Sequence, residues 1–396
     1  MTIGILGGGQ LGYMLALAGY PLGLHFRFLD PSPEAPVGRI ATRITARYDD
    51  HSALKKFAAG LELVTYEFEN VPVETARFLA ELVPVLPPPA ALEAAQDRLN
   101  EKHLFQKLGI ATTEFAPVSD EESLDRAVQQ IGLPAILKTC RMGYDGKGQW
   151  ILRGAEDVTR AKTEVGANPP ARKDSGKGNG AQHAPFLLER LVPFSRELSV
   201  LAVRARDGET AAYPLVENHH REGILRLSLA PAPQLDRAVQ QAAENAARRV
   251  LDALQHVGVL AIEFFEHEGR LLANEMAPRV HNSGHWTIEG AITSQFENHL
   301  RAVVGLPLGS TSAIGCSAML NLIGDVPDSA EVLAIRDAHL HLYGKTERAG
   351  RKLGHVTLRA SSPEQLASRL SELPTYFHRP EFGLDAVLRH SASARR

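Results

Sequence analysis

The sequence predicts an α/β fold that opens with a parallel sheet and continues into a lid and a tail of mixed helices and strands. Three observations support this prediction. The chain begins with an apolar run at residues 2–6, a glycine turn and a helical pattern; a glycine-rich loop at 143–148 separates two short strand patterns; and two longer strand patterns, 258–265 and 270–275, flank a short turn. With 396 residues and 44% hydrophobic content, the chain is long enough for about two to three domains.

Composition and charge exclude several classes of protein. The formal net charge of -3 gives no basic field for a nucleic-acid partner. Two cysteines, Cys140 and Cys316, are too few for a disulfide scaffold and suit a reducing compartment. No apolar run approaches the roughly 20 residues that cross a bilayer, and the N-terminus lacks the basic start of a signal peptide. We therefore expect a cytoplasmic protein with neither a membrane nor a nucleic-acid partner.

The first motif is the glycine turn, in which Gly7, Gly9 and Gly12 have the spacing G-x-G-x-x-G. A helical pattern follows at residues 13–20, and the next apolar run ends at Asp30. This arrangement lets the backbone approach a phosphate at the N-terminus of a helix. It is compatible with NAD, with another phosphate-bearing ligand, and with a tight turn that binds nothing.

The next segments indicate where one domain ends and another begins. Residues 61–66 read as a strand, residues 84–89 are rich in proline, and residues 96–108 have a helical pattern. The proline-rich stretch is a plausible seam between domains. The predicted domains are residues 1–97, residues 98–300 with a lid at about 115–190, and residues 301–396.

The lid contains a lysine followed by a glycine-rich flap. The strand pattern 133–138 ends in Lys138, the flap covers residues 143–148, and a second strand pattern spans 149–152. Such a lysine can contact phosphate oxygens while the backbone amides of the flap close over them. The alternative is an ordinary hairpin with a surface lysine, and the loop alone does not decide between the two. Residues 167–184, rich in glycine, proline and polar side chains, read as a mobile surface insertion.

Two glutamates interrupt the strand patterns on either side of the turn at residues 267–269. Glu263 lies within an apolar run and Glu275 ends another, with Asn274 beside it. Two carboxylates brought together in an apolar setting repel each other unless one is protonated or a cation lies between them. Magnesium prefers a few carboxylates together with nucleotide phosphates. The alternative is a pair of surface acids at strand ends, which the apolar flanks disfavour. The elements that lead up to this hairpin are strand patterns at 186–189 and 197–200 and a helical pattern at 234–254.

Two cationic clusters follow this hairpin. Residues 279–286, Arg-Val-His-Asn-Ser-Gly-His-Trp, come directly after it and could hold a small oxyanion beside a γ-phosphate. Residues 350–355, Gly-Arg-Lys-Leu-Gly-His, could clamp a phosphate or carboxylate, but the cluster taken alone favours a solvated turn. The sequence contains no CxxC or HExxH metal motif.

Taken together, these segments resemble the 5-(carboxyamino)imidazole ribonucleotide synthase family of ATP-grasp enzymes. The resembling segments span nearly the whole chain, and the most specific is Asn-Glu-x-Ala-Pro-Arg-x-His-Asn-Ser-Gly-His at residues 274–285, followed by Gly-Arg-Lys-x-Gly-His at 350–355. The resemblance implies an ATP-grasp fold with an N-terminal pre-ATP-grasp domain and a small C-terminal domain. The other resembling segments are residues 7–12, 65–72, 97–98, 143–148 and 343–345.

The resemblance also implies a reaction. ATP phosphorylates bicarbonate to carboxyphosphate, which breaks down to carbon dioxide and phosphate, and the amine of 5-aminoimidazole ribonucleotide attacks the carbon dioxide. Carboxyphosphate is short-lived in water, so a lid that excludes solvent agrees with this chemistry. The implied partners are ATP, bicarbonate and the ribonucleotide, with two magnesium ions and no NAD. A homodimer and a hand-off of the product to a mutase are also expected.

Site residues carry over position by position. The resemblance implies that Glu263 and Glu275 hold magnesium and that Arg279, His281 and Lys352 are catalytic, the first two at bicarbonate. The implied ATP contacts are Arg98, Lys138, Gly143, Tyr144, Asp145, Gly146, Lys147, Gly148, Glu189, Arg190, Leu191, Val192, Glu197, His220, Asn274 and Glu275. The implied ribonucleotide contacts are Gly9, Gln10, Leu11, Glu69, Tyr144, Asp145, Asn282, Ser283, Arg351, Lys352 and His355.

The sequence departs from the family pattern at Met142, where a flap glycine is expected, and in the lid insertion at 167–184. Both departures bear on the motion of the lid. Three rival functions remain: another ATP-grasp ligase, such as a formate-dependent glycinamide ribonucleotide transformylase or a biotin carboxylase; an NAD-dependent oxidoreductase; and a nucleotide-binding regulator without turnover. The cluster at 350–355 argues against the first, and the lid and paired glutamates are unexplained by the second.

Overall fold

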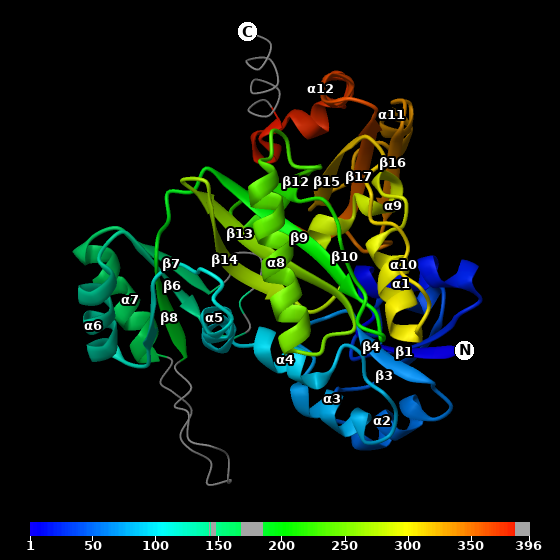
Figure 1. The fold of residues 1–396 in the computed structure, drawn as a ribbon, viewed down its shortest axis with the longest axis horizontal. Coiled ribbons are helices and arrows are strands. Elements are labelled where there is room, and N and C mark those ends of the chain that lie inside the picture. Colours follow the sequence, from blue (N-terminus) through cyan, green and yellow to red (C-terminus); the bar gives the residue numbers. More distant parts are fainter. Residues whose placement is uncertain (142, 144–147, 168–184, 385–396) are drawn as a thin grey trace.

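The computed structural model describes residues 1–141, 143, 148–167 and 185–384, and it arranges them around three β-sheets (Figure 1). The expectations for Met142, for flap residues 144–147 and for insertion residues 168–184 fall outside the described residues. In the part of the chain that is described, no helix is long and apolar enough to span a membrane.

The N-terminal sheet is parallel, as the opening motif predicts. Its strand order is β3-β2-β1-β4, and Ile5 of β1 pairs with Phe28 on one side and Thr65 on the other. Helix α1 begins at Gln10, three residues earlier than predicted, because Gly9 is its N-cap and the helix starts inside the glycine motif. The elements are β1 Thr2–Leu6, α1 Gln10–Gly19, β2 His25–Asp30, β3 Thr42–Thr45, α2 His51–Ala58, β4 Leu63–Tyr66, α3 Val73–Ala80 and α4 Pro89–Ala95.

The lid is a small antiparallel sheet with its own apolar core. Its order is β5-β8-β6-β7, and β7 occupies the predicted residues 149–152. Helix α6 begins with a capping box between Asp120 and Ser123, and its buried Leu124, Ala127 and Ile131 pack on the sheet. The lid elements are β5 Phe115–Val118, α6 Glu121–Ile131, β6 Ala135–Thr139, β7 Gln149–Leu152, α7 Ala155–Ala167 and β8 Phe186–Arg190.

The largest sheet joins the central part of the chain to the tail. Its order is β14-β13-β9-β11-β12-β15-β17-β16, with β10 paired to β9. Helix α8 covers the β9–β13–β14 end of this sheet through a stripe of small apolar residues (Figure 1). Its strands are β9 Arg196–Arg204, β10 Thr210–Ala212, β11 Val216–Arg221, β12 Ile224–Ala230, β13 Gly258–His267, β14 Arg270–Ala277, β15 Cys316–Ile323, β16 Ala338–Leu342 and β17 Lys352–Ala360.

Strand pairing continues across the predicted boundary at residue 300. Leu229 of β12 pairs with Ala318 of β15, so the tail extends the central sheet and places its cationic segment near the hairpin that carries Glu263 and Glu275. The remaining helices are α5 Arg98–Lys107, α8 Arg237–Ala253, α9 Thr287–Gly290, α10 Gln295–Val304, α11 Ser329–Leu333 and α12 Pro363–Ser371.

Candidate active site

The two predicted metal ligands lie opposite each other on β13 and β14. Glu263 pairs with Glu275, but the next pair is Phe264 with Ala273, so β14 has one extra residue, Asn274, at this point. A β-bulge of this kind redirects side chains that would otherwise alternate between the two faces of the sheet. Asn274 and Glu275 therefore line the same cavity although they are consecutive residues.

The two carboxylates have very different proton affinities. Burial and the nearby Glu275 carboxylate raise the pKa of Glu263 to about 7. Burial would also raise the pKa of Glu275, but the charge and hydrogen bond of Arg98 outweigh it and lower that pKa to about 2. Arg98 Nη1 lies 2.7 Å from Glu275 Oε2. The two buried carboxylates therefore differ in their affinity for a proton, and a cation between them would relieve their repulsion.

One cavity, which we call the lid-side cavity, has a volume of about 260 Å³ and lies between the lid sheet and the β13–β14 hairpin. Phe194 and Phe265 stack at one side with ring centroids 4.7 Å apart, so part of the wall is flat and apolar. Such a surface suits a nucleobase. The lining residues are Arg98, Thr113, Ile136, Lys138, Gln149, Glu189, Arg190, Leu191, Val192, Phe194, Glu197, His220, Gly223, Glu263, Phe265, Asn274 and Glu275.

A buried cluster of one acid and two lysines fixes the end of β6. Lys138 Nζ lies 2.5 Å from one Glu189 oxygen, and Lys102 Nζ lies 2.8 Å from the other. Burial lowers the pKa of Lys138, and the two lysines outweigh the effect of burial to lower the pKa of Glu189. The predicted adenine contact Glu189 thus has its carboxylate directed at lysines. Lys138 also donates to Asn274 Oδ1 at 3.3 Å, which ties the lid to the bulge.

His220 supplies a second cation to the lid-side cavity. Its Nδ1 lies 2.7 Å from Glu197 Oε2. Burial would lower the pKa of His220, but the hydrogen bond to Glu197 and the charge of Glu263 raise it to about 9. His220 is therefore a cation at neutral pH, as a contact to nucleotide oxygens requires.

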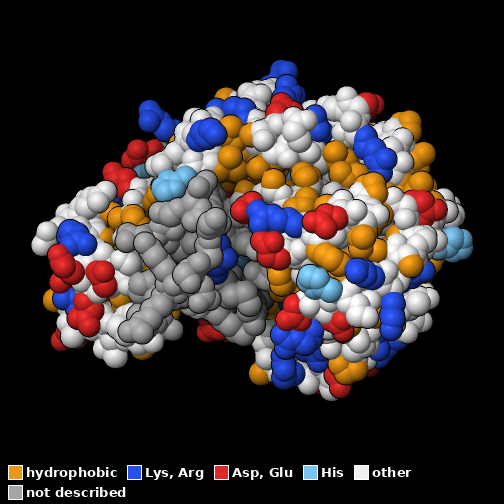
Figure 2. Space-filling view, turned by 90° about the horizontal axis from the view of Figure 1, so that it is seen from below, with side chains coloured by type: hydrophobic (Ala, Val, Ile, Leu, Met, Phe, Trp, Pro, Cys, Tyr) orange, Lys and Arg blue, Asp and Glu red, His pale blue; other side chains and the backbone are white. Residues whose placement is uncertain are grey.

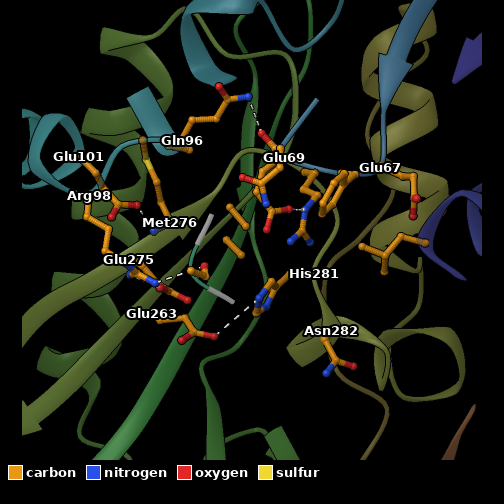
Figure 3. A pocket seen from close by; sticks show the side chains of 18 of the residues that line it. Glu67, Glu69, Gln96, Arg98, Glu101, Glu263, Glu275, Met276, His281 and Asn282 are labelled. Atoms are coloured by element: carbon orange, nitrogen blue, oxygen red, sulfur yellow. Dashed lines mark hydrogen bonds and ion pairs between the residues drawn. The ribbon is translucent and has the colours of Figure 1, made fainter. Parts of the chain in front are cut away.

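The second cavity, which we call the sheet-side cavity, has a volume of about 330 Å³ and reaches from the glycine turn to Glu263 and Glu275 (Figure 3). Arg98, Glu263 and Glu275 line both cavities, so the two cavities meet at these residues. The lining residues are Gln10, Leu11, Glu67, Phe68, Glu69, Asn70, Ala95, Gln96, Arg98, Glu101, Cys140, Gly143, Ala261, Glu263, Glu275, Met276, Ala277, Arg279, His281, Asn282 and Lys352.

Arg279 and His281 lie across this cavity from the paired glutamates. Arg279 forms an ion pair with Glu69, and the Arg279 side chain is only 12% exposed. Burial would lower the pKa of Arg279, but the Glu69 carboxylate outweighs burial and raises it. Burial and the Arg279 charge lower the pKa of His281 to about 3, so His281 is neutral at physiological pH. The cavity therefore presents one fixed cation and one neutral imidazole to a small anion.

Gln295 and Ser283 fix the position of His281. Gln295 Oε1 accepts from the His281 amide at 2.9 Å, and Gln295 Nε2 donates to the His281 carbonyl at 2.7 Å. Ser283 Oγ lies 2.9 Å from His281 Nδ1. The other ring nitrogen, Nε2, is 3.6 Å from Glu263 Oε1 (Figure 3). Ser283 is fully buried behind His281 and lies outside the lining of both cavities.

The glycine turn is filled by carboxylates of the protein itself. The Glu67 oxygens accept from the amides of Gly9 at 2.7 Å and Gly12 at 3.0 Å, and Asp30 Oδ2 accepts from Gly8 at 2.7 Å. A side chain at Gly9 would place its Cβ 2.7 Å from Glu67 Oε1, so the Glu67 carboxylate would have to shift to admit one. The turn thus positions the start of α1, and the next two residues, Gln10 and Leu11, face the sheet-side cavity.

The tail contributes Lys352 to the sheet-side cavity, whereas its neighbours point elsewhere. Arg351 is not among the lining residues, and its Nη1 donates to the Thr346 carbonyl at 3.2 Å. His355 is fully buried between His285 and His341, with ring centroids 4.7 and 4.4 Å away. The structure therefore gathers most of the predicted site around two cavities and leaves Gly9, Gly148, Ser283, Arg351 and His355 outside their linings. The predicted contacts Tyr144, Asp145, Gly146 and Lys147 lie outside the described residues.

Several residues near the site were absent from the sequence prediction. Glu67 belongs to the resembling segment 65–72, but the sequence prediction did not name it as a site residue. Two glutamates that alternate with aromatic residues, Glu67 and Glu69, could have indicated a polar site there. Glu101 and Lys102 lie on the polar-looking helix α5, where both are buried, at 2% and 1% exposure. Burial and the Glu275 charge raise the pKa of Glu101 to about 8.

Comparison with known proteins places these features in a family. The model of the ATP-grasp domain matches residues 103–296, that of the ribonucleotide synthetase preATP-grasp domain matches residues 1–96, and that of the phosphoribosylaminoimidazole carboxylase C-terminal domain matches residues 317–369. The chain is 53% identical to N5-carboxyaminoimidazole ribonucleotide synthase of Pseudomonas aeruginosa, over 94% of this chain and 98% of that one. It is 40% identical to the enzyme of the same name from Bacillus subtilis, over 90% of each.

Solved structures agree with these sequence relatives. N5-carboxyaminoimidazole ribonucleotide synthetase from Thermus thermophilus superimposes with a TM-score of 0.86 at 57% identity, covering 93% of this chain and 97% of that one. The synthase from Aspergillus clavatus, solved with ADP and 5-aminoimidazole ribonucleotide, gives a TM-score of 0.83 at 30% identity, covering 98% of each chain.

Proposed function

Because the chain belongs to the N5-carboxyaminoimidazole ribonucleotide synthase family of ATP-grasp enzymes, we propose that its lid-side cavity binds ATP and its sheet-side cavity binds bicarbonate and the ribonucleotide. The chain is an ATP-dependent ligase of purine biosynthesis that forms a C–N bond, as the sequence predicts. The ATP-grasp fold with its pre-ATP-grasp and C-terminal domains is likewise confirmed.

The reaction carboxylates 5-aminoimidazole ribonucleotide. A bicarbonate oxygen attacks the γ-phosphorus of ATP, which releases ADP and forms carboxyphosphate. In carboxyphosphate, the bond between the carbon and the bridging oxygen then breaks, which gives carbon dioxide and phosphate. The exocyclic amine of the ribonucleotide attacks the carbon dioxide and loses one proton, so the products are N5-carboxyaminoimidazole ribonucleotide, ADP and phosphate.

The single observation that supports this division is that Arg98, Glu263 and Glu275 line both cavities. A γ-phosphate held there is close to an anion in the sheet-side cavity, because both cavities border the same three side chains. Holding the reactants side by side supplies much of the rate enhancement of such a transfer. The cationic Arg98, Lys138 and His220 hold the phosphates, the flat apolar wall holds the adenine, and Glu197 binds the ribose.

The residues present fit magnesium. Glu263 and Glu275 face each other, and the pKa of Glu263 is raised while that of Glu275 is lowered. A divalent cation between the two carboxylates would relieve their mutual repulsion. No set of three or more His, Cys, Asp or Glu side chains is arranged to hold a metal within the described ranges, so phosphate oxygens and water would complete the coordination. When bound, two magnesium ions would neutralise charge on the phosphate oxygens.

Arg279 and His281 bind bicarbonate and the carboxyphosphate that forms from it, with Lys352 as the third catalytic side chain. Arg279 offers a planar set of donors that matches a carboxylate or phosphate. His281 is neutral and held by Ser283 and Gln295, so its Nε2 can accept or donate a hydrogen bond without adding charge. Gln10, Leu11, Glu69, Asn282 and Lys352 surround the ribonucleotide.

The remaining expectations stay predictions of this proposal. They are the substrate contacts of Gly9, Ser283, Arg351 and His355, the flap contacts of residues 143–148, the domain boundaries at residues 97 and 300, a homodimer, a cytoplasmic location and a hand-off of the product to a mutase. The lid and flap would exclude water from carboxyphosphate.

Substrate-dependent ADP formation tests the proposed function. With MgATP present, we expect ADP release to require both bicarbonate and 5-aminoimidazole ribonucleotide for full rate. Replacing the ribonucleotide and bicarbonate by glycinamide ribonucleotide and formate serves as the control for a related ATP-grasp ligase and is expected to give only background. An ADP rate with the proper substrates no higher than in buffer would contradict the proposal.

A further inference from the structure

Strand β14 carries the residues Asn274 and Glu275, yet it is the last strand of its sheet. On one side it pairs with β13, and the bulge at Asn274 interrupts that pairing. On the other side, among the described residues, no further strand of the sheet follows, and an isolated parallel bridge between Thr112 and Ala273 holds it at one point, where the Ala273 amide donates to the Ala111 carbonyl at 2.7 Å. An edge strand with a bulge is poorly held by the sheet alone, so other groups must fix its position.

Helix α5 supplies those groups from its first turn and a half. Glu101 Oε1 accepts from the Met276 amide at 2.5 Å, directly after Glu275. Lys102 Nζ donates to the Ala273 carbonyl at 3.1 Å, directly before Asn274. The two bonds therefore bracket the bulge, and Figure 3 shows Glu101 beside Met276 with Arg98, from the same helix, reaching Glu275.

Glu101 makes this contact as a buried side chain with 2% exposure. A buried carboxyl group is retained only where a specific partner compensates for its lost hydration. Glu101 accepts a hydrogen bond from a backbone amide of β14, and the steps of the reaction described above do not use this side chain. The hydrogen bond of Glu101 therefore serves to position strand β14.

We propose that Glu101 is a positioning residue that holds the bulged strand β14 through the Met276 amide, and so fixes Glu275 opposite Glu263 for magnesium binding. This inference rests on the proposed function of Glu263 and Glu275. Outer contacts that orient a metal ligand commonly contribute about 10- to 100-fold to metal affinity. Lys102 continues to hold the other side of the bulge when Glu101 is changed, so the loss should be local.

The test compares three substitutions at Glu101 by calorimetric titration of Mg²⁺ into the protein with ADP present, and by the magnesium dependence of ADP formation; both readouts should shift together. Glu101→Leu removes the acceptor, and we expect the magnesium concentration for half-maximal rate to rise about 10- to 100-fold, with a smaller change in kcat. Glu101→Gln keeps an acceptor oxygen at the same length and is expected to stay within about 3-fold of the parent. Glu101→Asp keeps the carboxyl group but is shorter by one methylene, and should resemble Glu101→Leu. Gln106→Leu, exposed on the same helix, is the matched control.

Two outcomes would overturn the inference. One is an unchanged magnesium requirement in Glu101→Leu or Glu101→Asp, which shows that the contact does not position Glu275 for magnesium binding. The other is a loss in Glu101→Gln as large as in Glu101→Leu, which shows that the charge or proton of Glu101 matters and not its acceptor. If Glu101→Leu fails to fold, the Asp and Gln variants decide the matter. Loss of activity in Glu275→Gln alongside a normal Glu101 series would reject this inference and leave the proposed function intact.

Discussion

Replacing Glu275 by glutamine lowers the rate of ADP formation about 1,000-fold, which corresponds to about 4 kcal/mol of transition-state stabilisation. The substitution removes a charged ligand from the proposed magnesium site and the partner of Arg98, whose Nη1 lies 2.7 Å from the Glu275 carboxylate. The amide has a similar shape, so the strand pairing with Glu263 should persist. Steady-state ADP formation at saturating ATP measures the effect.

The matched control is Glu268→Gln, an exposed carboxylate in the turn between the same two strands. It should retain the parent rate and melting temperature. A Glu275→Gln variant that folds normally and still releases ADP at the parent rate would move the metal away from this hairpin or indicate a nucleotide-binding protein without turnover.

Replacing Arg279 by lysine lowers kcat/KM for bicarbonate about 100-fold while the protein remains folded. Lysine keeps a positive charge for Glu69, so the buried ion pair is not left with an isolated carboxylate. It does not reproduce the planar guanidinium, which can bind bicarbonate through two parallel hydrogen bonds. The measurement is the bicarbonate dependence of ADP formation, with thermal unfolding recorded in parallel.

Arg301→Lys provides the comparison for this variant. Arg301 forms an ion pair with Glu297 one turn away on α10 and lies outside the lining of both cavities, so the same substitution there should leave the kinetics unchanged. An Arg279→Lys enzyme with the parent kcat/KM for bicarbonate would show that charge alone suffices and that the planar fork has no role.

Local patterns predicted the elements whose contacts are close in the sequence. The short apolar strand β7 and the hairpin that carries Glu263 and Glu275 were predicted from short segments, because each strand pairs with its neighbour along the chain. The parallel opening sheet followed from the order strand, glycine turn, helix, strand. These features depend on periodicity and turn chemistry, which a single sequence displays.

Contacts distant in the sequence could not be predicted in this way. Glu67 bonds to Gly9, 58 residues earlier, and Glu101 bonds to Met276, 175 residues later. The local sequence does not show which residue is the partner in either pair. Charged side chains in a helical pattern are usually exposed, so nothing in the segment distinguishes the buried Glu101 and Lys102 from solvated residues. The β-bulge at Asn274 is equally invisible, since it exists only in the pairing with β13.

Motif spacing also failed to show which way side chains point. Lys352 and His355 belong to one cationic cluster, and both lie on β17, three residues apart. A β-bulge lies between them, because Leu322 of β15 pairs with Gly354 and Ile323 pairs with Lys352, so the motif alone does not show where either side chain points. Lys352 lines the sheet-side cavity, whereas His355 is buried in a histidine stack and bonds Tyr343.

The central claim is that bicarbonate in the sheet-side cavity attacks ATP where the two cavities meet. A single turnover with bicarbonate labelled in all three oxygens by oxygen-18 tests it most directly. One bicarbonate oxygen becomes the bridge of carboxyphosphate and leaves with phosphorus, so each released phosphate should carry one labelled oxygen and the product two. Unlabelled phosphate in this experiment would contradict the account. If the same turnover with unlabelled bicarbonate in oxygen-18 water then gave labelled phosphate, water would be the group that attacks ATP.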